Sequence, residues 1–235
     1  MRILVSGVGQ GGTCLLIEVV RGLNIVEVTS KVEDRKFFRY KVLPNNYGTK
    51  LVVDQKVFSL DKLIELMNNY PDLYVLFSLR HPMDAFMSKL VRGQKPSDGG
   101  DGTLEKDVLS DVGTVDGALS AIEHFYSIYK DIKSRFPERV LVVKLENLIT
   151  MPKKEVERVA KFFGIEPNQR AFEFYKYNRN EYQEKRYGNS LDKSVIGINK
   201  RWDTWHNGFF KDRKADIDFV FDRLATIIQD WGYKQ

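Results

Sequence analysis

A glycine-rich stretch near the start of the sequence has the residue types that bind phosphate. Gly7-Val8-Gly9-Gln10-Gly11-Gly12-Thr13 separates an apolar run, Arg2–Ser6, from a segment of helical period, Thr13–Leu23. Between a strand and a helix, such a loop turns its backbone N–H groups toward one point, and the helix N-terminus adds positive potential there. We therefore expect this loop to hold a phosphate group.

The spacing of the glycines leaves more than one nucleotide class open. Gly7, Gly9 and Gly12 form a G-x-G-x-x-G pattern, and Glu27 follows Gly7 by about 20 positions, where dinucleotide folds carry a ribose-binding acid. An NAD(P)-dependent oxidoreductase is therefore an alternative. The spacing also matches a kinase phosphate loop, but Thr13 stands where that motif needs its Lys, which disfavours a P-loop kinase.

A second set of polar residues follows the apolar run Leu73–Leu79. Arg80 comes directly after this run, and Ser88 lies eight residues further on, in a segment expected to be helical. A guanidinium at a strand end and a hydroxyl from the next helix can bind one phosphate through charge-assisted hydrogen bonds. A dinucleotide dehydrogenase has no use for this pair.

Together these motifs resemble the sulfotransferases that use 3′-phosphoadenosine 5′-phosphosulfate (PAPS) and release adenosine 3′,5′-bisphosphate (PAP). The R-x-P-x-D-x-x-x-S pattern of residues 80–88 is similar to the family's 3′-phosphate site. Val140–Gly164 resembles its strand, Y-E-D-L-like stretch and following helix, and Trp231-Gly232-Tyr233 resembles a common C-terminal ending. Lys200-Arg201-Trp202 is similar to its basic loop near the nucleotide.

The resemblance implies a role for each matching residue. The 5′-phosphosulfate would be held by the loop residues Gln10, Gly11, Gly12, Thr13 and Cys14. The 3′-phosphate would be held by Arg80 and Ser88, with Lys200 and Arg201 adding to the nucleotide site. The reaction would be direct in-line transfer of a sulfuryl group to a hydroxyl or amine, and it needs no metal.

This sequence departs from the family pattern at two loop positions. The family usually has Lys or Arg where Gln10 stands, and Cys14 replaces a Thr. Tyr47-Gly48-Thr49-Lys50 resembles a W-G-D-K-like stretch, so Lys50 is the candidate to stabilise the leaving phosphate. Glu33 or Asp34, ahead of a Phe pair, resembles the position of the catalytic base in glycan sulfotransferases, and Glu33 is preferred.

The elements that must position these residues alternate between short apolar runs and longer helical periods. This order predicts a single α/β domain over residues 1–235, with a mostly parallel central sheet between helices in a P-loop-like three-layer fold. The predicted strands are Arg2–Ser6, Leu73–Leu79 and Arg139–Val143. The predicted helices are Thr13–Leu23, Asp61–Tyr70, Met83–Val91, Val115–Phe136, Lys153–Phe163 and Ile217–Trp231.

Two polar segments interrupt this alternation. Residues 93–117 contain six glycines and six acids, which predicts a long mobile loop within the domain that borders the acceptor site. Residues 176–201 contain seven basic residues and three acidic ones, and this excess predicts either an anion-binding segment or a solvated basic face.

Composition and charge indicate which cellular compartment and which partners to expect. The 235 residues carry 37 Lys and Arg against 32 Asp and Glu, with a single Cys. There is no apolar run of the roughly 18 residues that a membrane span needs, and the charge excess is too small to indicate nucleic acid. We expect a cytoplasmic enzyme acting on a small-molecule or glycan acceptor. A regulatory nucleotide-binding module that has lost catalysis is the non-enzymatic alternative.

Overall fold

The computed structural model describes residues 1–9, 11–28, 33–53, 57–94, 114–177 and 214–233. Its centre is a five-stranded sheet with the strand order β2-β3-β1-β4-β5, and every pairing is parallel. The strands are β1 (Arg2–Gly7), β2 (Glu27–Val28), β3 (Tyr47–Lys50), β4 (Leu73–Leu79) and β5 (Val140–Lys144). The predicted α/β fold with a parallel central sheet is confirmed.

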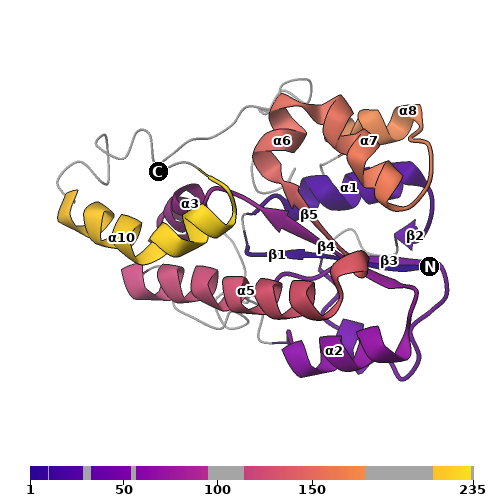
Figure 1. Cartoon of the computed structure of the whole chain (residues 1–235), viewed down its shortest axis with the longest axis horizontal. Helices are drawn as coiled ribbons and strands as arrows, with labels where there is room; N and C mark the ends of the chain where they lie inside the picture. The colour runs from indigo at the N-terminus through magenta and orange to yellow at the C-terminus, as the bar shows by residue number, and fades with distance from the viewer. Residues whose placement is uncertain (10, 29–32, 54–56, 95–113, 178–213, 234–235) are drawn as a thin grey trace.

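Helices cover both faces of this sheet, which gives the predicted three layers (Figure 1). One face is covered by α1 (Thr13–Leu23), α6 (Leu145–Thr150), α7 (Pro152–Phe162) and α8 (Gln169–Phe172). The other face is covered by α2 (Leu60–Asn69) and α5 (Val115–Arg135), with α3 (Pro82–Gln94) and α10 (Lys214–Asp230) packed beside α5. Short 3₁₀ helices within the described ranges are η1 (Phe37–Arg39), η2 (Pro137–Arg139) and η3 (Phe174–Tyr177).

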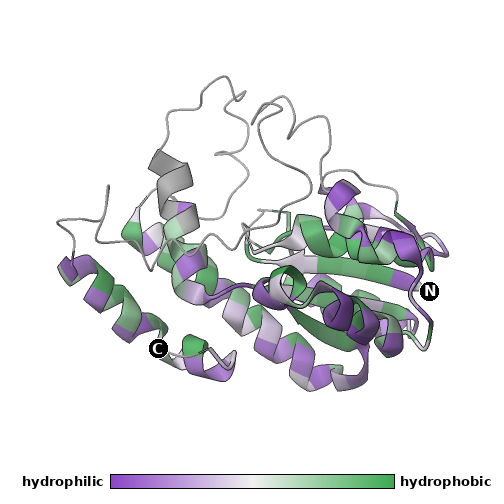
Figure 2. Ribbon diagram, turned by 90° about the horizontal axis from the view of Figure 1, so that it is seen from above, coloured by the Kyte–Doolittle hydropathy of each residue, from purple (hydrophilic) through white to green (hydrophobic). Residues whose placement is uncertain are grey.

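The core consists of two apolar layers separated by the sheet. Successive side chains of a strand point to opposite faces, so Leu4 of β1 joins the layer under α2, α5, α3 and α10. Ile3 and Val5 join the layer under α1, α7 and α8. Figure 2 shows the result, with green apolar strands between helices whose outer faces are largely purple. Because β1 is buried from both sides, the loop that follows it has a rigid base.

Of the two helices that border the predicted acidic loop, α3 is longer than expected and α5 begins where expected. α3 continues to Gln94 rather than ending at Val91, and α5 begins at Val115. The Thr114 hydroxyl caps α5 by accepting a hydrogen bond from the N–H of Gly117, at 3.1 Å. Both ends of the 93–117 segment are therefore helical, and residues 95–113 lie outside the described residues.

Two kinds of feature are absent from the described residues. None of their helices combines the length and apolar character that a membrane-spanning helix requires. Nor do three or more of their His, Cys, Asp or Glu side chains gather in a way that could hold a metal ion.

Candidate functional site

The glycine loop follows β1 and turns sharply into α1. Gly12 precedes the helix with φ 93°, a left-handed conformation that favours glycine, and a Cβ there would lie 2.7 Å from Cδ1 of Leu145. The N–H of Gly11 donates to the Val8 carbonyl at 2.9 Å, and the Ser78 hydroxyl of β4 donates to the Gly11 carbonyl at 2.6 Å. The loop is thus held by its own turn and by the neighbouring strand.

The first turn of α1 offers backbone donors to an anion. Thr13 and Cys14 are its first two residues, and their N–H groups precede the first i to i−4 hydrogen bond of the helix. The first turn of α1 contains no acidic residue that would oppose a bound anion. These backbone groups could bind an anion, but their role in holding the phosphate stays a prediction, and Gln10 lies outside the described residues.

Lys50 ends β3 beside the loop, and its ammonium group reaches the first turn of α1. It pairs in register with Val5 of β1, and only 6% of the residue is exposed. Its Nζ lies 3.2 Å from Cys14 Sγ, and within the described part of the chain no carboxylate forms an ion pair with it. Among the described residues, then, this buried cation has a thiol partner but no anion that would balance its charge.

The two candidate bases lie next to Lys50 in the structure. The Asp34 N–H donates to the Lys50 carbonyl at 2.8 Å, which fixes this segment beside the end of β3. The Asp34 carboxylate accepts the Tyr47 hydroxyl and, at 2.9 Å, the Lys36 N–H. Burial, followed by this hydrogen bond to Asp34, raises the pKa of Tyr47 far above its ordinary value. Asp34 therefore has a structural task, and Glu33, the base that the sequence favours, is half-buried next to it.

Arg80 follows β4 and is held by a residue that sequence reasoning did not select. Its Nε donates to Asp84 Oδ2 at 2.7 Å, and a terminal nitrogen of the guanidinium also pairs with that oxygen. Both residues are buried, Arg80 at 8% and Asp84 at 2% exposure. The i, i+4 spacing in a segment of helical period was the signal that could have found this pair. Asp84 fixes the direction of the guanidinium.

The sheet brings three of the predicted groups to one edge. β3 and β4 flank β1, so Lys50, the glycine loop and Arg80 all lie at carboxyl ends of neighbouring parallel strands. Strands about 4.8 Å apart separate β3 from β4 by about 10 Å across β1, and β4 ends three residues, about 10 Å, further along the strands than β3. In open α/β sheets, ligands bind at this edge.

The other predicted site residues fall partly or wholly outside the description. Ser88 lies in α3, where the backbone is described but the position of this side chain is not. Lys200 and Arg201 belong to the undescribed residues 178–213. Their nucleotide-binding roles stay predictions.

The structure does not support the dinucleotide alternative. Glu27 begins β2 and pairs in register with Tyr47, which pairs with Arg2 at the start of β1. The glycine loop begins after Gly7, about 16 Å further along the strands at about 3.3 Å per residue. In addition, β3 separates β2 from β1, whereas a dinucleotide fold pairs these two directly. Glu27 is therefore at the wrong end of the sheet to bind a ribose near the loop.

Comparisons with known proteins agree with this arrangement. A family model described as "Sulfotransferase family" matches residues 29–169, more than half of the chain. The crystal structure of mouse sulfotransferase SULT7A1 complexed with PAP is similar with a TM-score of 0.62 and 13% identity, over 95% of this chain and 84% of that one. The sulfotransferase domain from the curacin biosynthetic pathway is similar with a TM-score of 0.57 and 11% identity, over 95% and 96% of the two chains. No curated protein sequence gives a significant match.

Proposed function

This chain belongs to the sulfotransferase family, and we propose that it transfers a sulfuryl group from PAPS to a hydroxyl or amine of a small-molecule or glycan acceptor. The observation that carries the proposal is the buried Lys50 ammonium, 3.2 Å from Cys14 in the first turn of α1. A buried cation beside open backbone donors suits a doubly charged phosphate. The PAP complex of the mouse protein supports PAPS as the donor.

In this proposal the donor spans the edge of the sheet. The N–H groups of Gly12, Thr13 and Cys14 bind the 5′-phosphate oxygens, and Gln10 donates from the same loop. Arg80, oriented by Asp84, binds the 3′-phosphate, with Ser88 as its second ligand and Lys200 and Arg201 as further nucleotide contacts. The ends of β3 and β4 lie about 10 Å apart across β1 and about 10 Å apart along the strands, which gives an extended nucleotide room to reach both phosphate positions.

The chemical step exchanges one bond to sulfur for another. The acceptor oxygen or nitrogen bonds to sulfur as the bond between sulfur and the bridging phosphate oxygen breaks, and the electron pair of that bond stays with the phosphate of PAP. Lys50 stabilises the charge that develops on the phosphate, because its buried ammonium is already held at the first turn of α1 before the donor binds. Glu33 accepts the proton of the acceptor, and Asp34 holds the segment in place.

The experiment is transfer of labelled sulfate from PAPS to a panel of metabolites and glycans, together with calorimetry of PAP and AMP. The proposal expects a labelled product, an equal amount of PAP, and tighter binding of PAP than of AMP. If PAP binds tightly but no acceptor is sulfated, the non-catalytic nucleotide-binding module is the better description. Equal affinity for PAP and AMP would contradict the assignment of Arg80.

A further inference from the structure

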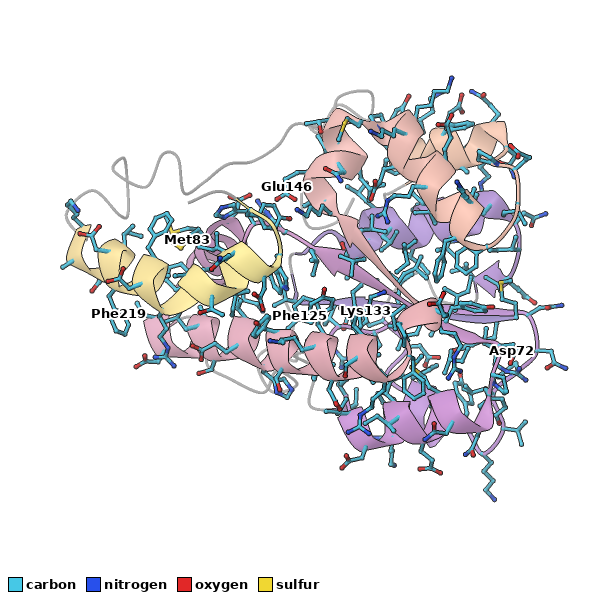
Figure 3. All side chains as sticks on the ribbon, viewed as in Figure 1. Asp72, Met83, Phe125, Lys133, Glu146 and Phe219 are labelled. Atoms are coloured by element: carbon cyan, nitrogen blue, oxygen red, sulfur yellow. The ribbon has the colours of Figure 1, made fainter. Side chains whose placement is uncertain are left out.

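The peptide bond between Arg80 and His81 forms a hydrogen bond with the carboxylate of Glu146, which has no role in the proposed reaction. The N–H of His81 donates to Glu146 Oε1 at 2.8 Å. The other oxygen of Glu146 accepts the Tyr233 hydroxyl at 2.7 Å. Figure 3 shows Glu146 on the side of α6 that faces α3 and the C-terminal turn of α10.

Tyr233 is itself firmly placed by the turn that ends α10. Gly232 has φ 64° and donates its N–H to Gln229, while the Tyr233 N–H reaches back to Ile228 at 2.9 Å. This pattern is a helix-ending turn that glycine favours. Lys144 of β5 donates to the Gly232 carbonyl at 3.1 Å, and its ammonium lies 4.4 Å from the centre of the Tyr233 ring.

The Tyr233 ring also contacts the turn that carries Arg80. Its centroid lies 5.0 Å from that of His81, in an edge-to-face arrangement. Burial, together with the negative charge of Glu146 and the hydrogen bond to it, raises the pKa of Tyr233 well above its ordinary value. The hydroxyl therefore remains a donor to Glu146 across the ordinary pH range.

We propose that Glu146 and Tyr233 are positioning residues for the 3′-phosphate site, fixing the Arg80–His81 peptide so that Arg80 meets the phosphate without reorganising. The inference rests on the proposed function, because it assumes that Arg80 binds this phosphate. Asp84 fixes the guanidinium end of Arg80 and Glu146 fixes its backbone end. Preorganisation from both ends lowers the cost of ordering a long side chain when the ligand binds.

The effect should be confined to ligands that carry a 3′-phosphate. AMP has the 5′-phosphate of PAP but not its 3′-phosphate, so the ratio of the two dissociation constants isolates the Arg80 contact. If Tyr233 only stabilised the fold, Tyr233→Phe would weaken the binding of PAP and of AMP alike and leave the ratio unchanged. Loss of one hydrogen bond in the support should reduce the preference for PAP by about threefold to tenfold.

The test compares Tyr233→Phe with the matched variant Tyr126→Phe by calorimetry of PAP and AMP. Tyr126 also donates its hydroxyl to a carboxylate, that of Asp230, and so also anchors the end of α10, but to α5 rather than to the Arg80 turn. We expect Tyr233→Phe to lower the preference for PAP and Tyr126→Phe to keep it. Glu146→Gln should lower it too, and adding Tyr233→Phe to Glu146→Gln should have a smaller effect than in the wild type.

The outcomes separate the inference from the proposed function. If the wild type prefers PAP and Tyr233→Phe retains the full preference, or weakens PAP and AMP alike, the positioning role is refuted and the proposed function stands. If the wild type does not prefer PAP at all, the assignment of Arg80 fails and the positioning role fails with it. Tyr233→Phe removes only a hydroxyl, so it decides the matter even if Glu146→Gln does not fold.

Discussion

Replacing Lys50 with Met should raise stability and lower turnover in the same protein. Only 6% of Lys50 is exposed. Among the described residues, its Nζ has a hydrogen bond only with the thiol of Cys14. Burying an ammonium without a counter-charge opposes folding, and Met fills a similar volume without that cost. A gain of about 1 kcal/mol in the free energy of unfolding would raise Tm by about 2 to 4 °C in a domain of this size.

The same charge should lower the activation free energy of sulfuryl transfer by more than its burial lowers the free energy of unfolding. A unit charge about 4 Å away contributes about 4 kcal/mol at an effective dielectric constant of about 20. Removal of one preorganised transition-state donor lowers kcat by about 10²-fold to 10³-fold. We expect Lys50→Met to show that loss in single-turnover transfer from PAPS, with a much smaller change in PAP affinity.

Lys133→Met is the matched control for this prediction. Lys133 also has a partly buried ammonium, but it donates to the carbonyls of Pro137 and Val140, both at 3.0 Å, near the start of β5. Its loss should lower Tm and leave kcat unchanged. Gln10→Lys should partly restore the turnover of Lys50→Met by returning a cation to the loop. A Lys50→Met protein with lower Tm and normal kcat would refute the reasoning.

Three further outcomes test the nucleotide site, the base and the packing. Arg80→Ala should weaken the binding of PAP by about 10-fold to 150-fold in calorimetry and hardly change the binding of AMP. Arg135→Ala, which breaks an exposed ion pair of the same i, i+4 spacing, should change the binding of neither ligand. Glu33→Gln should lower kcat by about 10²-fold or more at unchanged PAP affinity, and normal turnover would move the base elsewhere. Gly22→Ala should cost about 1 to 3 kcal/mol in a denaturant titration, because its Cβ would lie 2.5 Å from Cα of Ala171, and an unchanged midpoint would contradict this packing.

The parts of the fold that sequence predicts are those with a long local signal. Arg2–Ser6 and Leu73–Leu79 are mostly apolar runs, and they form β1 and β4 almost residue for residue. β3 has no such signal, because Tyr47–Lys50 spans four residues of mixed polarity. It is buried through its neighbours instead, as Gly48 shows, where a Cβ would lie 2.7 Å from a methyl group of Val26.

The residues of the candidate site also differ in how far the sequence alone predicts them. The glycine loop and Arg80 stand next to strong strands, so the sequence alone places them at one edge of the sheet. Glu146 also follows a predicted strand, but its hydrogen bonds have no local marker, because its two partners, His81 and Tyr233, lie 65 and 87 positions away in the chain. A carboxylate whose task is to accept hydrogen bonds from distant segments becomes recognisable only when the fold has brought them together.

The two cations of the proposed site whose side chains the structure describes, Arg80 and Lys50, have different surroundings, and the difference matches the two roles proposed for them. Arg80 has a buried carboxylate, Asp84, on its guanidinium, so its direction is set before a ligand arrives and its charge is partly balanced. Lys50 has no carboxylate partner among the described residues, so its full charge acts on whatever occupies the first turn of α1. Oriented and balanced charge suits recognition of a phosphate that stays unchanged through the reaction. Unbalanced charge suits a phosphate that gains negative charge as the bond to sulfur breaks, because the attraction then grows along the reaction coordinate and lowers the barrier.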